Sequence, residues 1–227
     1  MSRVGVKRQT EKRGQGGQET GSGSDSALLA EPTLLRCPWV PAGDALYIAY
    51  HDGEWGVPLR EDRDLFELLV LEGAQAGLNW RSILARRAAY RRAFCDFVPE
   101  EVASFGPARI ESLLADPGII RNRAKIESTV GNARALLDLR EQTGSTFSTF
   151  LWTLVGGCPV IGHVGPDDTA PAETPISRTV SQALKKAGFR FVGPVIVQSY
   201  LEASGLLMDH VVSCFRYEAL AQGETGA

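Results

Sequence analysis

Apolar residues recur at spacings of three and four along most of this chain, and this pattern constrains the fold more than any other feature. Such spacing gathers apolar side chains on one face of a helix, whereas a half-buried strand would alternate apolar and polar residues. No sustained alternation and no solenoid-length repeat stands out. The apolar stripes are Leu65, Leu68 and Leu69; Trp80, Ile83, Leu84 and Ala88; Ile126, Val130, Ala133 and Leu137; Phe147, Phe150, Leu151 and Leu154; and Val180, Leu184 and Ala187. The sequence therefore predicts an all-α fold.

Capping and turn residues indicate where several of these helices begin and end. Asn79 is a good N-cap for the second stripe, Gly188 follows the last one, and Pro194 suits the first turn of the next helix. We expect His210 to Cys214 to lie in a further short helical stretch. The segment 156–175 contains Gly, Pro and Asp throughout and is predicted to be a surface loop.

The two ends of the chain differ in composition from its middle. Residues 1–33 are rich in Gly, Ser, Gln and Glu, and almost no large apolar side chain precedes Leu28. Burial cannot offset the ordering entropy of such a segment, so residues 1–33 are predicted to be a disordered tail. Its few basic residues leave open a weak, nonspecific contact with polyanions. Residues 34–220 are expected to form a helical domain of one or two lobes, with a C-terminal tail at 221–227.

Bulk properties narrow the class of protein. A hydrophobic content of 44% in 227 residues is enough for one substantial core. No apolar run approaches 18 residues and no secretory signal is evident, so we expect a soluble, cytoplasmic protein with no membrane partner. The net charge of −3 argues against bulk attraction to nucleic acid but allows a local basic face. Four scattered cysteines indicate reduced thiols or metal ligands rather than a disulfide scaffold.

Glu72 is the strongest candidate for a ligand-binding residue. It closes the apolar run Leu68–Leu71, so a helix here leaves it where an unpaired charge is costly. Tyr47, Tyr50, Trp55 and Trp80 bracket it in sequence, and their electron-rich rings would attract a flat cation. The alternative is an ordinary aromatic core with a salt-bridged glutamate.

Two cysteines and two histidines form a candidate metal site. His210 and Cys214 are four positions apart, which places both on one face of a helix, and Cys37 and His51 lie near the other end of the predicted domain. A Cys₂His₂ set suits tetrahedral Zn²⁺, and four ligands with no open position indicate a structural ion that ties the two ends of the domain together. Alternatively, the thiols and imidazoles are ordinary core residues.

A turn around Gly118 is a candidate phosphate-binding segment. The sequence DPGIIRNRAK at 116–125 places a glycine turn before a helix, whose N-terminal amides can face a phosphate. Arg121, Arg123 and Lys125 add local positive charge. This is how a helix-hairpin-helix holds a DNA strand without reading its sequence, although a plain turn with a solvated basic face is the alternative.

Taken together, these residues resemble the 3-methyladenine DNA glycosylase I family of the helix-hairpin-helix superfamily. The resemblance covers residues 37–217 and rests on LYIAYHDGEWGVP (46–58), LEGAQAGLNW (71–80), GIIRNRAKI (118–126), ALKKAGFRFVG (183–193) and DHVVSC (209–214). The Gly/Ser-rich N-terminal tail is not part of the family pattern. Ala74 stands in a motif where glutamine is often found, which leaves details of the pocket open.

The resemblance implies a role for each candidate residue. Glu72 falls on the pocket carboxylate that reads the methylated adenine, and it is assigned base recognition first and electrostatic stabilisation second. Tyr50 and Trp80 fall on aromatic pocket positions, with Tyr47 and Trp55 as close companions.

The resemblance also implies how the protein binds DNA and metal. Leu78 matches the wedge beside the lesion, and the Gly118 turn matches the hairpin. The structural zinc ligands fall on Cys37, His51, His210 and Cys214, one ion per chain.

The resemblance implies a monofunctional DNA-3-methyladenine glycosylase, a repair hydrolase that acts as a monomer on double-stranded DNA containing alkylated bases. Two other hypotheses remain open. One is a noncatalytic, zinc-stapled helical module that binds damaged or distorted DNA. The other is a metalloenzyme, which would need an open coordination position that four protein ligands do not leave.

Overall fold

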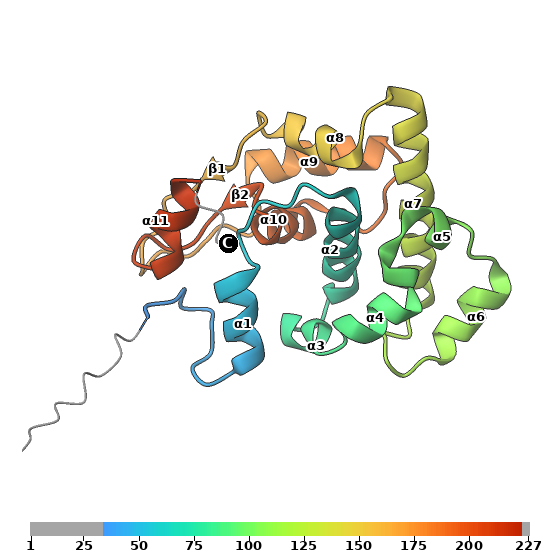
Figure 1. Cartoon of the computed structure of the whole chain (residues 1–227), viewed down its shortest axis with the longest axis horizontal. Coiled ribbons are helices and arrows are strands. Elements are labelled where there is room, and N and C mark those ends of the chain that lie inside the picture. The colour runs from blue at the N-terminus through green and yellow to red at the C-terminus, as the bar shows by residue number, and fades with distance from the viewer. Residues whose placement is uncertain (1–33, 224–227) are drawn as a thin grey trace, which may run out of the picture. The chain divides into compact units, whose positions relative to one another are not determined.

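The computed structural model describes residues 34–223, which are mostly helical (Figure 1). The predicted tail at 1–33 and residues 224–227 lie outside the described residues. The elements are α1 (Ala45–Gly53), α2 (Asp62–Gln75), α3 (Trp80–Leu84), α4 (Arg87–Ala93), the 3-10 helix η1 (Cys95–Phe97), α5 (Pro99–Ala103), α6 (Pro107–Ala115), α7 (Arg123–Thr143), α8 (Phe147–Leu154), β1 (Val160–Ile161), α9 (Pro175–Lys186), α10 (Pro194–Ala203), β2 (Leu207–Met208) and α11 (Phe215–Ala221). The predicted helical character is confirmed. Among residues 34–223, no helix has both the length and the apolar content needed to cross a membrane.

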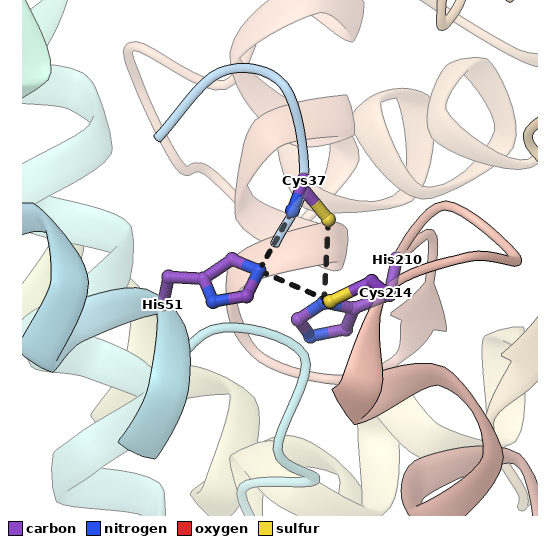
Figure 2. Close-up of side chains that lie close together, drawn as sticks. All are labelled: Cys37, His51, His210 and Cys214. Carbon is purple, nitrogen blue, oxygen red and sulfur yellow. Dashed lines mark hydrogen bonds between the residues drawn. The ribbon is translucent and has the colours of Figure 1, made fainter. Parts of the chain in front are cut away.

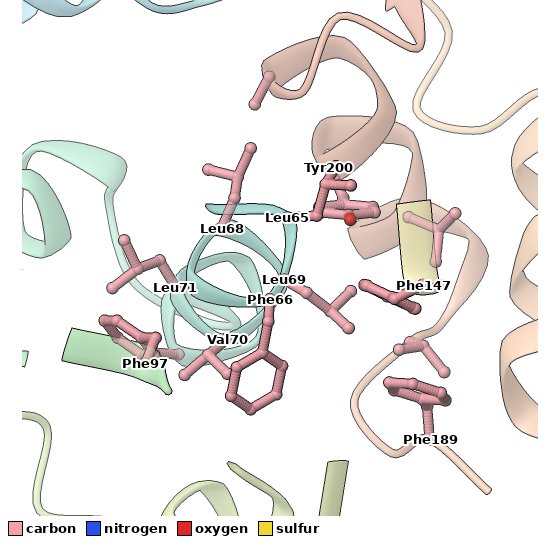
Figure 3. Packing of buried hydrophobic residues seen from close by; sticks show 14 of the residues in the cluster. Leu65, Phe66, Leu68, Leu69, Val70, Leu71, Phe97, Phe147, Phe189 and Tyr200 are labelled. Atoms are coloured by element: carbon pink, nitrogen blue, oxygen red, sulfur yellow. The ribbon is translucent and has the colours of Figure 1, made fainter. Parts of the chain in front are cut away.

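Helix α2 forms the centre of the core. Every residue from Leu65 to Ala74 is buried, so this helix has no solvated face over most of its length. Figure 3 shows its side chains pointing outward in several directions, toward Phe97 of η1 and toward Phe147 and Tyr200 of α8 and α10. A helix that is apolar all round is one that other elements surround. The continuous apolar run that ends at Glu72 is the sequence signature of this arrangement.

Asp62, the first residue of α2, fixes the start of α8. Its carboxylate accepts hydrogen bonds from the backbone N–H groups of Phe147 and Ser148, at 2.9 and 2.7 Å. Arg140 of α7 donates to the same carboxylate at 3.0 Å. The exposed amides at a helix N-terminus favour a negative charge, so one side chain links three helices.

The predicted helix boundaries are largely confirmed. The Asn79 side chain accepts a hydrogen bond from the Ser82 N–H at 2.8 Å, as an N-cap does. Gly188 takes a φ of +90° after α9, and Pro194 lies in the first turn of α10. The stripe from Trp80 to Ala88 is divided between α3 and α4, with a turn at residues 85–86 between them.

Two predictions about the C-terminal region are corrected by a small parallel sheet. The segment 156–175 contains β1, which pairs with β2 in the register Val160–Leu207 and Ile161–Met208. A further bridge joins Val164 to Val211, and a turn follows in which the Cys214 N–H donates to the Val211 carbonyl at 2.8 Å. His210–Cys214 is therefore not helical, and α11 begins only after it. Strands of two residues are too short to produce an alternating pattern, and their partners lie more than 40 positions apart in the sequence.

Replacing Asp62 with alanine is expected to lower the free energy of unfolding by about 2 kcal/mol, because two amides of α8 and Arg140 lose a charged acceptor. Urea unfolding measures this value. The matched control is Asp138→Ala on the exposed side of α7, where the change should stay within about 0.5 kcal/mol. Equal losses in the two variants would contradict the assigned role of Asp62.

Candidate active site and metal centre

Glu72 lies in the last part of α2 and is only 4% exposed. Burial raises the pKa of its carboxyl group to about 8, and the negative charge of Glu202 on α10 raises it further in the same direction. Desolvation has this effect on any carboxyl group that no cation compensates. The predicted burial of Glu72 is confirmed, and the salt-bridged alternative does not fit this environment.

Glu72 opens onto a cavity that also contains the four aromatic residues predicted from the sequence. The cavity is lined by Trp39, Tyr47, Tyr50, Trp55, Glu72, Gln75, Trp80, Ser199 and Glu202. Its walls therefore come from α1, the start of α3, the segment around Trp39 and α10, while α2 contributes the carboxyl group at one side.

The aromatic rings form one tilted pair and one edge-to-face pair around the cavity. The ring centroids of Tyr50 and Trp80 are 5.5 Å apart, and those of Trp39 and Trp55 are 5.0 Å apart. Burial, followed by the charge of Glu72, raises the pKa of Tyr50 well above its usual value, so its phenol is neutral at physiological pH. Trp80 Nε1 is buried and has no hydrogen-bond acceptor among the described residues. Buried donors that lack an acceptor are uncommon in folded proteins.

Four residues of this cavity were not identified from the sequence. Trp39 lies two positions after Cys37, so its closeness to a candidate metal ligand was an available signal. Gln75 lies within the motif that contains Glu72 and could have been found by its spacing. Ser199 and Glu202 are on α10, more than 120 positions beyond Glu72, and no local pattern marks them.

The predicted metal-binding residues come together beside this cavity. Figure 2 shows Cys37, His51, His210 and Cys214 directed toward one another, and their ligand atoms all lie within 4.8 Å of each other. All four residues are buried. The four predicted residues therefore form one cluster that could hold a metal ion.

The distances within this cluster fit a tetrahedral ion. Cys214 Sγ lies 3.4 Å from His51 Nε2 and 3.4 Å from His210 Nδ1, and Cys37 Sγ lies 3.4 Å from His210 Nδ1. Sulfur and nitrogen ligands of one tetrahedral zinc ion lie roughly 3.6 Å apart. The hydrogen bond with Cys37, and then those with His210 and His51, lower the pKa of the Cys214 thiol, which favours the thiolate form that metals bind.

The second nitrogen of each imidazole is held by an outer partner. His51 Nδ1 lies 2.7 Å from Asp52 Oδ1, and His210 Nε2 lies 3.0 Å from the carbonyl oxygen of Trp55. Partners of this kind orient histidine ligands in metal sites. Arg36 in turn donates two hydrogen bonds to Asp52 from Nε, at 2.8 and 3.0 Å. Because Trp55 lines the cavity, the cluster is mechanically connected to the aromatic wall.

Leu78 lies on the turn that follows α2. Gly77 takes a φ of +79°, and the Gln75 side chain donates to the Leu78 carbonyl at 3.1 Å, so the turn is braced beside the cavity. The Leu78 side chain is 42% exposed. Lys125 Nζ donates to the carbonyl oxygens of Ala74 and Ala76, at 2.8 and 2.7 Å. It thus satisfies the free carbonyls at the C-terminus of α2, a role that sequence reasoning did not assign to it.

The Gly118 turn joins α6 to α7, as expected for a helix–turn–helix hairpin. A Cβ atom at this glycine would lie 2.8 Å from Ala89 Cβ, so the turn packs closely on α4. Its N–H donates to Asp116 Oδ1 at 2.7 Å, which means that this amide is engaged inside the protein.

The basic residues after this turn differ in their surroundings. Arg123 forms ion pairs with Glu111 and Glu127, at 2.6 and 3.5 Å, while Arg121 is exposed. Arg121 is therefore the basic residue of this segment best placed to meet a phosphate.

Comparison with known proteins places this geometry in a family. The chain matches the methyladenine glycosylase family model over residues 39–217. DNA-3-methyladenine glycosylase 1 of Escherichia coli (strain K12) is 47% identical over 184 residues, which are 81% of this chain and 97% of that protein.

Solved structures agree with this match. A crystal structure of 3-methyladenine DNA glycosylase I has a TM-score of 0.76 and 47% identity, and the match covers 80% of this chain and 98% of that one. A variant of 3-methyladenine DNA glycosylase I in complex with 3-methyladenine has a TM-score of 0.74 and 38% identity, over 77% of this chain and 94% of that one. The resemblance in the sequence motifs is confirmed, and the chain belongs to the methyladenine glycosylase family.

Proposed function

We propose that this protein is a monofunctional DNA glycosylase, which removes 3-methyladenine from alkylated DNA by hydrolysing the N-glycosidic bond. The observation that carries the proposal is a buried carboxyl group, Glu72, that faces an aromatic cavity and has no cationic partner within residues 34–223. The relatives named for this activity, and the solved complex with 3-methyladenine, support the same substrate.

The cavity suits a flat, positively charged base. In an adenine nucleotide methylated at N3, the base carries a positive charge. Each good contact between this cation and an aromatic face stabilises its binding by roughly 0.5–2 kcal/mol. Entry of this cation favours the ionised form of Glu72, whose carboxylate then accepts hydrogen bonds from the amine edge of the base. The unpaired indole N–H of Trp80 and the neutral phenol of Tyr50 supply donors.

Recognition of the charged base carries much of the catalysis. The positive charge already weakens the glycosidic bond, so the leaving base needs no strong protonation. Holding the cation in the cavity places Glu72 near the charge that changes as the bond breaks. A water molecule is the attacking group, and Glu72 acts as base reader first and electrostatic stabiliser second.

The surface near the cavity mouth is proposed to hold the damaged duplex. The base must leave the helical stack, which costs a few kcal/mol and costs less for a damaged pair. Leu78 is exposed on its braced turn and can fill the vacated position as an apolar wedge. The Gly118 turn and Arg121 contact the phosphate backbone, with Arg123 and Lys125 adding positive charge behind them. One protein chain, acting as a monomer, binds one site of double-stranded DNA.

The Cys/His cluster is proposed to hold one structural Zn²⁺ per chain. The soft and borderline ligands Cys37, His51, His210 and Cys214 leave no position open for water. The ion would join the segment before α1 to the segment before α11, and through Trp39 and Trp55 it would support the aromatic wall.

Replacing Glu72 with glutamine is expected to reduce release of 3-methyladenine about 100-fold or more, because the amide keeps the shape of the side chain but removes its negative charge. Single-turnover reactions on methylated duplex DNA, with chromatographic identification of the free base, measure the rate. Glu141→Gln on the exposed part of α7 serves as the matched control. A wild-type protein that binds methylated DNA and releases no base would overturn the proposed function and favour a noncatalytic binding module.

The Glu72→Gln substitution is also expected to change how the free energy of unfolding depends on pH. In the unfolded chain the Glu72 carboxyl group has its ordinary pKa of 4.5, whereas in the folded protein the pKa is about 8. Between these values the folded state binds more protons, so the wild type loses stability as pH rises. The advantage of Glu72→Gln in free energy of unfolding should therefore grow by about 2–4 kcal/mol between pH 4.5 and 8. Urea unfolding at several pH values checks this; a constant difference would contradict it.

Replacing Cys214 with alanine is expected to remove the bound zinc and to lower the free energy of unfolding by about 3 kcal/mol or more, because metal binding contributes directly to folding. Metal analysis of the purified protein and thermal unfolding provide the two measurements. Cys158→Ala is the matched control, since Cys158 is an exposed free thiol. Equal zinc content in the two variants would rule out the proposed site.

A further inference from the structure

We propose that Glu202 is a second carboxylate of the base pocket, which selects positively charged bases against neutral bases of the same shape. The inference rests on the proposed function, because it concerns how the same pocket distinguishes its substrate. Neither the sequence motifs nor the assignment of Glu72 as base reader requires this residue.

The position of Glu202 gives it access to the bound base. It lies on α10 and lines the cavity that Glu72 lines from α2. It also lines a neighbouring cavity that contains Asp168, Asp209 and the rings of Trp39 and Trp55. Among residues 34–223, no Lys, Arg or His lines either cavity. Within these linings, no cationic side chain therefore offsets the charge of the carboxyl groups.

A short chain of hydrogen bonds holds Glu202 in place. Gln198 Nε2, one helical turn earlier on α10, donates to Glu202 Oε1 at 2.8 Å. Thr174 Oγ1 donates to Gln198 Oε1 at 2.8 Å, and Thr174 is the N-cap of α9. Because Gln198 is only 2% exposed, its amide is fixed by these two contacts. The carboxyl group of Glu202 is thus a preorganised feature of the pocket and not a mobile surface group.

The two carboxyl groups influence each other and the guest. Burial raises the pKa of Glu202 to about 7, and the nearby charge of Asp209 acts in the same direction. The charge of Glu202 also raises the pKa of Glu72. Around neutral pH, two such groups facing one cavity retain protons, since two uncompensated negative charges are costly there. A cationic base can compensate the negative charge of these carboxyl groups in place of a bound proton, whereas a neutral base cannot. The second carboxylate therefore increases the preference of the pocket for a cationic base over a neutral one.

The test compares a cation with a neutral isostere in the same pocket. The probes are 3,9-dimethyladenine, which is a cation, and 3-deaza-3,9-dimethyladenine; both are measured at one pH, chosen so that the second is neutral. Quenching of tryptophan fluorescence gives both dissociation constants for the wild type and for Glu202→Gln, Glu202→Asp and the exposed control Glu218→Gln. Release of 3-methyladenine from methylated DNA by the wild type is measured in parallel.

In Glu202→Gln, binding of the cation should weaken about tenfold, and binding of the neutral isostere should change by less than about twofold. Glu202→Asp should retain most of the preference for the cation, and Glu218→Gln should match the wild type. An unchanged ratio of the two dissociation constants in Glu202→Gln would overturn the inference. So would an equal weakening of both ligands, which indicates a structural role. If the wild type fails to release base, the proposed function is wrong. The ratio of the two dissociation constants would still decide whether Glu202 selects cations.

Discussion

The cost of keeping a carboxyl group out of water governs the functional part of this structure. Glu72 belongs to a helix that other elements surround, so its position follows from the packing of Leu65 to Ala74 and not from any partner of its own. The protein tolerates this cost by letting the group keep its proton over part of the neutral range. In the proposed function, a bound cation would remove the same cost, so affinity for the guest would depend directly on its charge.

The aromatic wall of the cavity is connected to the Cys/His cluster. Trp39 and Trp55 lie between the cavity and the Cys/His cluster, and the Trp55 carbonyl contacts a ring nitrogen of His210. The ring of Trp39 lies 5.3 Å from that of His51. Any ion that fixes the two histidines therefore also fixes the two indoles. Lys125 has a comparable effect on the other side, where it holds the end of α2 through two backbone carbonyls.

The sequence was sufficient for features that local patterns encode. Helical spacing predicted the fold class, the run before Glu72 predicted its burial, and Asn79 predicted the start of α3. The pairing of β1 with β2 was missed because two-residue strands have no period and their partners are distant. Ser199 and Glu202 were missed for a related reason: they face the cavity only because α10 packs against α2, which is a tertiary contact.

The spacing of the Cys/His cluster has a consequence for synthesis of the chain. His51 and Cys214 are 163 positions apart, and at about 5–20 residues per second the ribosome needs roughly 10–30 s to add the intervening residues. During this interval the nascent chain displays one thiol and one imidazole whose partners do not yet exist. The wall that contains Trp55 can be completed only after α10 and the segment behind it have emerged. The pocket can therefore be completed only near the end of synthesis, well after the residues of α2 have been made.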